Sequence, residues 1–203
     1  MTYSTTSQPP NNYQLPFVSR WDRPENMYPG VDPLPPILPD VQPNEGLSLQ
    51  HIRKYESDAT GGYNAVNQGG AEGGTKVLGY SGPFGGHKKH KGKELTNLTL
   101  AEIQALQDDT GYAYDEPGWQ RWYDDGRLNA VGAYQFNKPT LSDLIEKSKL
   151  PPYTKFTPAV QDYLGIMLLR ERGVQPWVGP SNKANPQELL EIEAGRTSTE
   201  VEP

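Results

Sequence analysis

The 203-residue chain contains no cysteine, a low share of apolar residues and no long hydrophobic run. The lack of cysteine excludes disulfide bonds, thiol catalysis and thiolate metal sites. No run approaches the roughly 18 apolar residues of a transmembrane helix, so no membrane span is expected. The first residues lack a basic segment followed by an apolar stretch, so no secretory signal is expected either. Apolar residues make up 34% of the chain and its mean hydropathy is −0.77, which predicts that part of it lies outside any compact core.

Basic residues are also fewer than acidic ones, 19 against 25, so the net charge is −6. The acidic excess lies at the two ends: residues 1–46 and 181–203 each carry a net charge of −3, and residues 47–180 are neutral. Proteins dedicated to nucleic acid normally have an excess of positive charge. A nucleic-acid partner is therefore not expected.

Residues 1–46 hold ten of the chain's 20 prolines and show no helical or alternating apolar period. Proline fixes φ and removes the amide donor, so this segment is predicted to be extended. It nevertheless carries scattered large apolar groups, including Phe17, Trp21 and the Pro33–Pro39 stretch. One interpretation is a leader that packs on its own domain. We favour an extended Pro-rich arm that binds other subunits of an assembly.

Residues 47–180 predict an α+β domain that is mainly helical, with a small Gly-rich β insertion. Leu49, Ile52 and Tyr55 recur at helical spacing over residues 48–56. Residues 61–92 then hold eleven of the chain's 21 glycines, and residues 76–80 within them are predicted to form part of a hairpin.

Four later helices have recognisable start signals. Thr99 and Glu102 form a capping box that starts the first of these helices. Cap residues or a first-turn proline place the others over residues 139–147, 158–172 and 186–194. Residues 181–203 are therefore expected to form a short helix followed by an acidic tail.

Glu56 is the candidate catalytic residue. It lies in the last turn of a predicted helix, where the negative end of the helix dipole disfavours a carboxylate. Shielding by Tyr55 and Tyr63 would keep its proton to higher pH, and a protonated carboxyl near neutrality is what acid-catalysed cleavage of a glycosidic bond requires. The alternative is a surface glutamate that happens to end a helix.

Three segments carry a family resemblance. Tyr55-Glu56-Ser57 with residues 62–67, then Gly132-Ala133-Tyr134-Gln135-Phe136, then residues 156–173 resemble, in that order, lysozyme-like muramidases and lytic transglycosylases of the phage lambda endolysin type. Ala133 stands where this family usually has Arg, and the stretch between Glu56 and Gln135 is longer than in the lambda enzyme.

The resemblance implies a role for each matching position. Glu56 would donate a proton to the oxygen between N-acetylmuramic acid and N-acetylglucosamine. Tyr134 and Gln135 would lie across the cleft and contact the sugar, with Tyr63 and Asn64 as further substrate-binding residues. Neither a metal nor a cofactor is implied. The lambda-type enzymes use the sugar's own 6-hydroxyl, whereas a hydrolase needs a second carboxylate, for which the sequence offers Asp58, Asp124 and Asp125.

Two functional classes follow from the resemblance. The first is a virion-associated enzyme that degrades peptidoglycan during phage entry, with glycan strands as substrate and phage structural proteins as partners of residues 1–46. The second is a structural tail or baseplate component whose lysozyme-like lobe is catalytically idle. Both predict a location in the virion, in the tail or inside the particle, because an enzyme delivered by a particle needs no positive charge to reach an acidic wall.

Two other features are less specific. The basic run over residues 87–93 contains two His at i, i+3, which is a poor zinc site, and it is expected to be a solvated loop. Trp119 and Trp122, with neighbouring tyrosines, predict either a sugar-stacking platform or ordinary packing.

Overall fold

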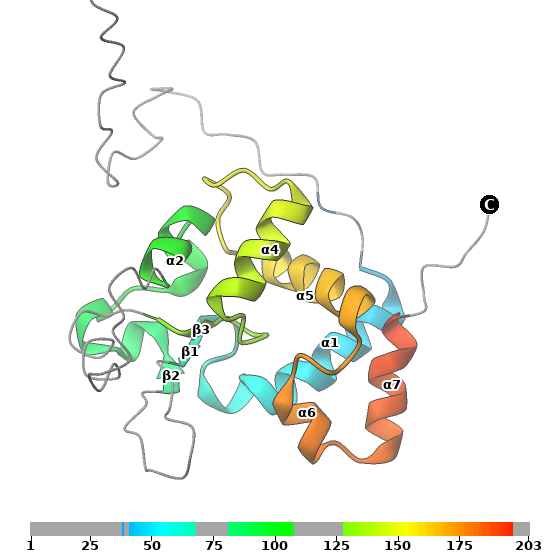
Figure 1. The fold of residues 1–203 in the computed structure, drawn as a ribbon. Helices are drawn as coiled ribbons and strands as arrows, with labels where there is room; N and C mark the ends of the chain where they lie inside the picture. The colour runs from blue at the N-terminus through cyan, green and yellow to red at the C-terminus, as the bar shows by residue number, and fades with distance from the viewer. Residues whose placement is uncertain (1–37, 39–40, 68–80, 108–127, 197–203) are drawn as a thin grey trace, which may run out of the picture. The chain divides into compact units, whose positions relative to one another are not determined.

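A computed structural model of the chain describes residues 38, 41–67, 81–107 and 128–196, all of which belong to one compact unit. These residues are mostly helical with one small antiparallel sheet, which confirms the predicted α+β class at that level (Figure 1). The predicted arm up to residue 37, the predicted hairpin at residues 76–80, and Trp119, Trp122, Asp124 and Asp125 lie outside the described residues. Within the described part, no helix has the length and apolar character that crossing a bilayer requires.

The described helices are α1 (Pro43–Glu56), α2 (Leu100–Leu106), α4 (Lys138–Ser148), α5 (Pro158–Arg172), α6 (Val178–Lys183) and α7 (Pro186–Arg196). The strands are β1 (Ala65–Asn67), β2 (Ser81–Pro83) and β3 (Ala130–Val131), in the spatial order β2-β1-β3. Val66 in the central strand pairs with Gly82 on one side and with Val131 on the other. Short 3-10 turns fill the segment between α1 and β1 and the segment between β2 and α2.

The start signals of three helices are confirmed by their hydrogen bonds. Thr99 Oγ1 accepts from Glu102 N at 3.2 Å and Glu102 Oε2 accepts from Thr99 N at 2.9 Å, which completes the predicted capping box. Thr157 caps α5, which ends before Gly173 as predicted. Asn185 Oδ1 accepts from Glu188 N at 3.0 Å at the start of α7. These signals are local, so they act without help from the tertiary structure.

Helix α1 begins earlier than the sequence predicts. Pro43 occupies its first turn, and Glu45 accepts a hydrogen bond from the Gln42 backbone N–H at 2.9 Å. Glu45 is fully buried and pairs with Arg170 of α5. Residues 43–46 therefore belong to the helical domain and not to the arm.

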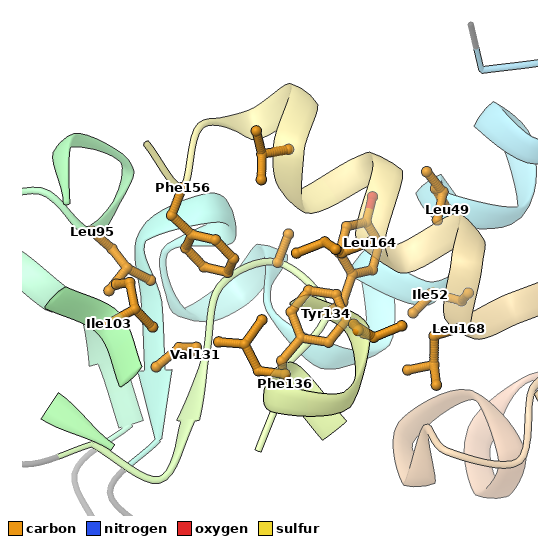
Figure 2. Packing of buried hydrophobic residues seen from close by; sticks show 14 of the residues in the cluster. Leu49, Ile52, Leu95, Ile103, Val131, Tyr134, Phe136, Phe156, Leu164 and Leu168 are labelled. Atoms are coloured by element: carbon orange, nitrogen blue, oxygen red, sulfur yellow. The ribbon is translucent and has the colours of Figure 1, made fainter. Parts of the chain in front are cut away.

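The core lies where α1, α4 and α5 meet the sheet and the turn that follows β3. Figure 2 shows Tyr134 and Phe136 from this turn packed among leucines of α5, with Phe156 and Ile103 farther along the same cluster. Tyr134 is 1% exposed. The core thus fixes the turn that carries the predicted Tyr134-Gln135 pair.

The predicted short helix after residue 185 is present as α7, and it packs against α1, so the domain extends past the predicted boundary at residue 180 (Figure 1). The predicted acidic tail from residue 197 onward lies outside the described residues. Ser48 Oγ of α1 donates to the Glu191 carbonyl at 3.0 Å. The helix continues to Arg196, two residues past the predicted range of 186–194, and Leu190 on it is 66% exposed.

The contact between α1 and α7 should weaken in acid. Lys54, Tyr55 and the Asn185 backbone N–H donate hydrogen bonds to Glu188 and lower its pKa to about 2. A carboxyl with a lowered folded pKa stabilises the protein above its ordinary value near 4.5, and this stabilisation is lost as the pH falls toward 2. Urea unfolding between pH 2 and 5 should show a smaller loss for Glu188→Gln than for the parent. Glu146→Gln on α4 is the charge-matched control, and an unchanged pH profile in Glu188→Gln would contradict this expectation.

Candidate active site

A polar groove of about 270 Å³ lies at the C-terminal end of α1, between the sheet and the segment that leads into α6. Its described lining combines β-strand residues with the α1 end, the 132–136 turn and the loop before α6: Glu56, Thr60, Val66, Asn67, Ser81, Ala130, Gln135, Pro176 and Trp177. Glu56 is the sole titratable residue in this lining. The groove thus places the candidate acid and Gln135 at one site, as the sequence predicts.

Burial controls the electrostatics of Glu56. The side chain is half-buried, and its pKa is raised mainly because burial disfavours the charged carboxylate. The Gly179 backbone N–H and the charge of Lys183 oppose this shift but do not cancel it. Glu56 therefore holds its proton to higher pH than an exposed glutamate does.

Helix α6 positions one oxygen of the carboxyl group. Gly179 N donates to Glu56 Oε1 at 2.8 Å. A Cβ at position 179 would lie 2.7 Å from that oxygen and 2.9 Å from the Tyr55 carbonyl, so this close approach requires glycine. Glu56 Oε2 forms no hydrogen bond with a described residue, which leaves that oxygen for a ligand in the groove.

Gln135 reaches the groove from a tight and strained turn. Val131 and Phe136 pair on either side of it, and Gln135 adopts φ +48°, a left-handed conformation that costs on the order of 1 kcal/mol for a residue other than glycine. Gln135 Nε2 donates to the Gly132 carbonyl at 2.8 Å, which fixes the side-chain amide. Strain held by surrounding structure is typical of functional positions.

Three side chains from outside the turn hold its backbone. Ser57 Oγ donates to the Ala133 carbonyl at 2.8 Å, and Trp177 Nε1 donates to the Tyr134 carbonyl at 2.9 Å. Gln161 Oε1 accepts from Ala133 N at 2.8 Å, while Gln161 Nε2 donates to the carbonyls of Tyr63 and Phe156. The turn is thus attached to the residue that follows α1, to α5 and to the loop before α6.

Gly132 allows this attachment. It adopts φ +75°, and a Cβ there would lie 2.3 Å from Gln161 Oε1. Any side chain at position 132 would therefore displace the amide that holds the turn.

The structure corrects the predicted roles of Tyr134 and Tyr63. Neither lines the groove, because their hydroxyl groups donate to Asp162 of α5 within the domain and Arg53 donates to both tyrosines. Burial and Asp162 raise the pKa of Tyr63 to about 12 and that of Tyr134 still further, so both remain protonated donors. These tyrosines support the turn and the α1 end from within the domain and do not face a substrate in the groove.

Two other predicted residues also lie away from the groove lining. Asn64 Oδ1 accepts a hydrogen bond from Thr96 N at 3.1 Å and so links the turn before β1 to the turn before α2. Asp58 is exposed and is not part of the lining, which removes the one described candidate for a second catalytic carboxylate.

Sequence reasoning missed the side of the groove formed by Pro176 and Trp177, the two residues that precede α6. Trp177 is 2% exposed and has its indole N–H on the turn. The available signal was a tryptophan directly after a proline in a loop that follows a helix stop. Its relation to Glu56 depends on a contact across more than a hundred residues, and no local pattern reports such a contact.

The raised pKa of Glu56 gives a testable pH dependence. A carboxyl whose folded pKa is raised lowers stability as the pH rises above its ordinary value, because the folded state then holds the proton more tightly than the unfolded state. Glu56→Gln keeps an acceptor for Gly179 N–H and removes this penalty. In urea titrations, the free energy of unfolding of Glu56→Gln minus that of the parent should therefore be larger at pH 7 than at pH 4, which means that the variant gains stability relative to the parent as the pH rises. The same difference at both pH values would show that burial does not hold the proton, and Asp58→Asn is the exposed control.

No group of three or more His, Asp or Glu residues suited to a metal ion occurs within the part of the chain that the structure describes. Comparisons of the chain with protein-family models, with curated proteins and with solved structures found no match.

Proposed function

We propose that this chain cleaves the glycosidic bond between N-acetylmuramic acid and N-acetylglucosamine in peptidoglycan, with Glu56 as the general acid. The observation that carries the proposal is a half-buried carboxyl of raised pKa, at the end of a helix, in a polar groove that it shares with a strained Gln135. A general acid needs its proton near the working pH, and burial raises the pKa of Glu56 in that direction.

The lytic transglycosylase form of the reaction is favoured over hydrolysis. Hydrolysis with two carboxylates requires a second Asp or Glu across the groove. The described lining contains one carboxyl group, that of Glu56, and its other polar side chains include Thr60, Asn67, Ser81 and Gln135. In the favoured form, Glu56 protonates the bridging oxygen, the sugar's 6-hydroxyl attacks the anomeric carbon, and the carboxylate recovers the hydroxyl proton.

Digestion of purified peptidoglycan with mass analysis of the products tests the proposal. The expected products end in 1,6-anhydro sugars. Products heavier by one water would contradict the transglycosylase form and point to a hydrolase. No soluble product from the full chain would contradict cleavage altogether.

One observation favours a second function, a structural tail or baseplate component with an idle groove. The hydrogen bond from Gly179 N to Glu56 Oε1 favours the ionised carboxyl, which opposes a role as proton donor. In either function, the arm that precedes α1, residues 1–42, is proposed to bind phage structural proteins and to place the chain in the virion. Incorporation of a chain lacking the arm into particles at the normal level would contradict that part of the proposal.

A further inference from the structure

The loop that follows β2 concentrates exposed positive charge. Its exposed lysines are Lys88, Lys89, Lys91 and Lys93. The last three form no ion pair with a described residue. In contrast, every described arginine pairs with a carboxylate: Arg53 with Asp162, Arg170 with Glu45, Arg172 with Asp143 and Glu171, and Arg196 with Glu193.

These lysines project from a fixed base. His87 and His90 are 1% and 7% exposed, and the His90 ring stacks on buried Phe84 with centroids 4.3 Å apart. Gly92 N donates to the Gly85 carbonyl at 3.2 Å and closes the loop. The expectation of a fully solvated loop is therefore wrong for the histidines, which are buried, and right for the lysines. We call residues 84–93 the lysine platform.

The lysine platform is directly connected to the groove. Ser81, the first residue of β2, lines the groove, and Phe84 follows the last residue of the same strand. Because β2 spans only three residues, a polymer that occupies the groove and extends along this strand reaches the platform within a few sugar units.

We propose that the lysine platform binds the carboxylates of the peptides attached to the glycan strand, so that the substrate is peptide-bearing and not bare glycan. This inference rests on the proposed function, since it takes the polymer in the groove to be peptidoglycan. The sugars in the chain are neutral, and the negative charge of the strand lies on the lactyl-linked peptides. Lys89, Lys91 and Lys93, whose ammonium groups form no ion pair with the residues that the structure describes, can pair with such carboxylates. Residues 47–180 have no net charge, so they supply no net attraction of their own.

The test measures binding separately from cleavage. The full chain carrying Glu56→Gln is co-sedimented with insoluble peptidoglycan from which phosphate-containing polymers have been removed. Lys89→Gln/Lys91→Gln should weaken binding about three- to tenfold at low salt, since exposed charge pairs contribute modestly and are screened by salt. The matched control is Lys149→Gln/Lys155→Gln, which removes the same charge from exposed lysines elsewhere and should bind like the parent.

Competition identifies the ligand. Soluble peptide-bearing glycan should displace the parent more effectively than glycan stripped of its peptides, and this preference should disappear in Lys89→Gln/Lys91→Gln. Equal binding by the platform and control variants, or a loss that is the same on stripped glycan, would overturn the inference. Lysine-dependent binding without any digestion by the parent would instead refute cleavage and still support binding of peptide carboxylates by the lysine platform.

Discussion

Replacing Glu56 by Gln is expected to lower the rate of peptidoglycan solubilisation by roughly 100- to 10,000-fold, the contribution typical of a positioned general acid. The substitution keeps the shape of the side chain and an acceptor for Gly179 N–H, which lies 2.8 Å from Oε1. It removes the proton that the bridging oxygen must receive. The loss should therefore appear in the rate of the chemical step, while binding to insoluble peptidoglycan stays within about twofold of the parent.

Asp58→Asn is the control for this experiment. Asp58 is two residues farther along the chain, is exposed and lies outside the groove lining, so its loss should leave the rate near that of the parent. Near-parental solubilisation by Glu56→Gln would contradict the role assigned to Glu56. An equal loss in both variants would show that the effect is one of charge and not of the groove.

Gln161→Leu is expected to destabilise the domain by about 2–5 kcal/mol, because it leaves buried backbone groups without partners. The Gln161 side chain is fully buried and bonds Ala133 N, the Tyr63 carbonyl and the Phe156 carbonyl. Leucine has a similar volume but can form none of these bonds. Urea unfolding of the full chain measures the loss.

Gln104→Leu provides the matched control for that substitution. Gln104 is half-buried on α2 and donates one hydrogen bond of 3.3 Å to Ser142 Oγ. Its replacement should change the free energy of unfolding by less than about 1 kcal/mol. A comparable loss in both variants would show that the hydrogen bonds of Gln161 to the 132–136 turn contribute no more to stability than the single hydrogen bond of Gln104 does.

The elements that the sequence predicts well are those with local causes. A capping box at Thr99, a cap at Thr157 and a cap at Asn185 each satisfy backbone donors within three residues, so the helices start where the pattern indicates. The end of α1 at Glu56 agrees with two other local signals, the apolar spacing over residues 48–56 and the glycines from Gly61 onward.

The predictions that failed depend on contacts between distant segments. Tyr134 was expected across the groove, but Asp162 of α5 binds its hydroxyl group inside the domain. The α7 helix was expected, but outside a domain that ends at residue 180, whereas Glu188 and Ser48 attach it to α1. A single sequence shows that a tyrosine or a glutamate can form such bonds, and it does not show with which partner.

Two features of the groove lower the stability of the domain. Gln135 is held in a left-handed conformation, and the carboxyl group of Glu56 is half-buried where its charged form is disfavoured. Both lie at the same groove, whose turn is attached by Ser57, Gln161 and Trp177. We infer that this attachment offsets the strain and keeps the two polar side chains in place.

The most direct test of the central claim is a structure of the Glu56→Gln variant bound to a peptidoglycan fragment that spans one intact bond between N-acetylmuramic acid and N-acetylglucosamine. The account predicts that the bridging oxygen lies within hydrogen-bond distance, about 3 Å, of the side chain at position 56, with Gln135 against the adjoining sugar. A fragment bound away from this groove, or seated in it with the bridging oxygen out of reach of position 56, would contradict the claim.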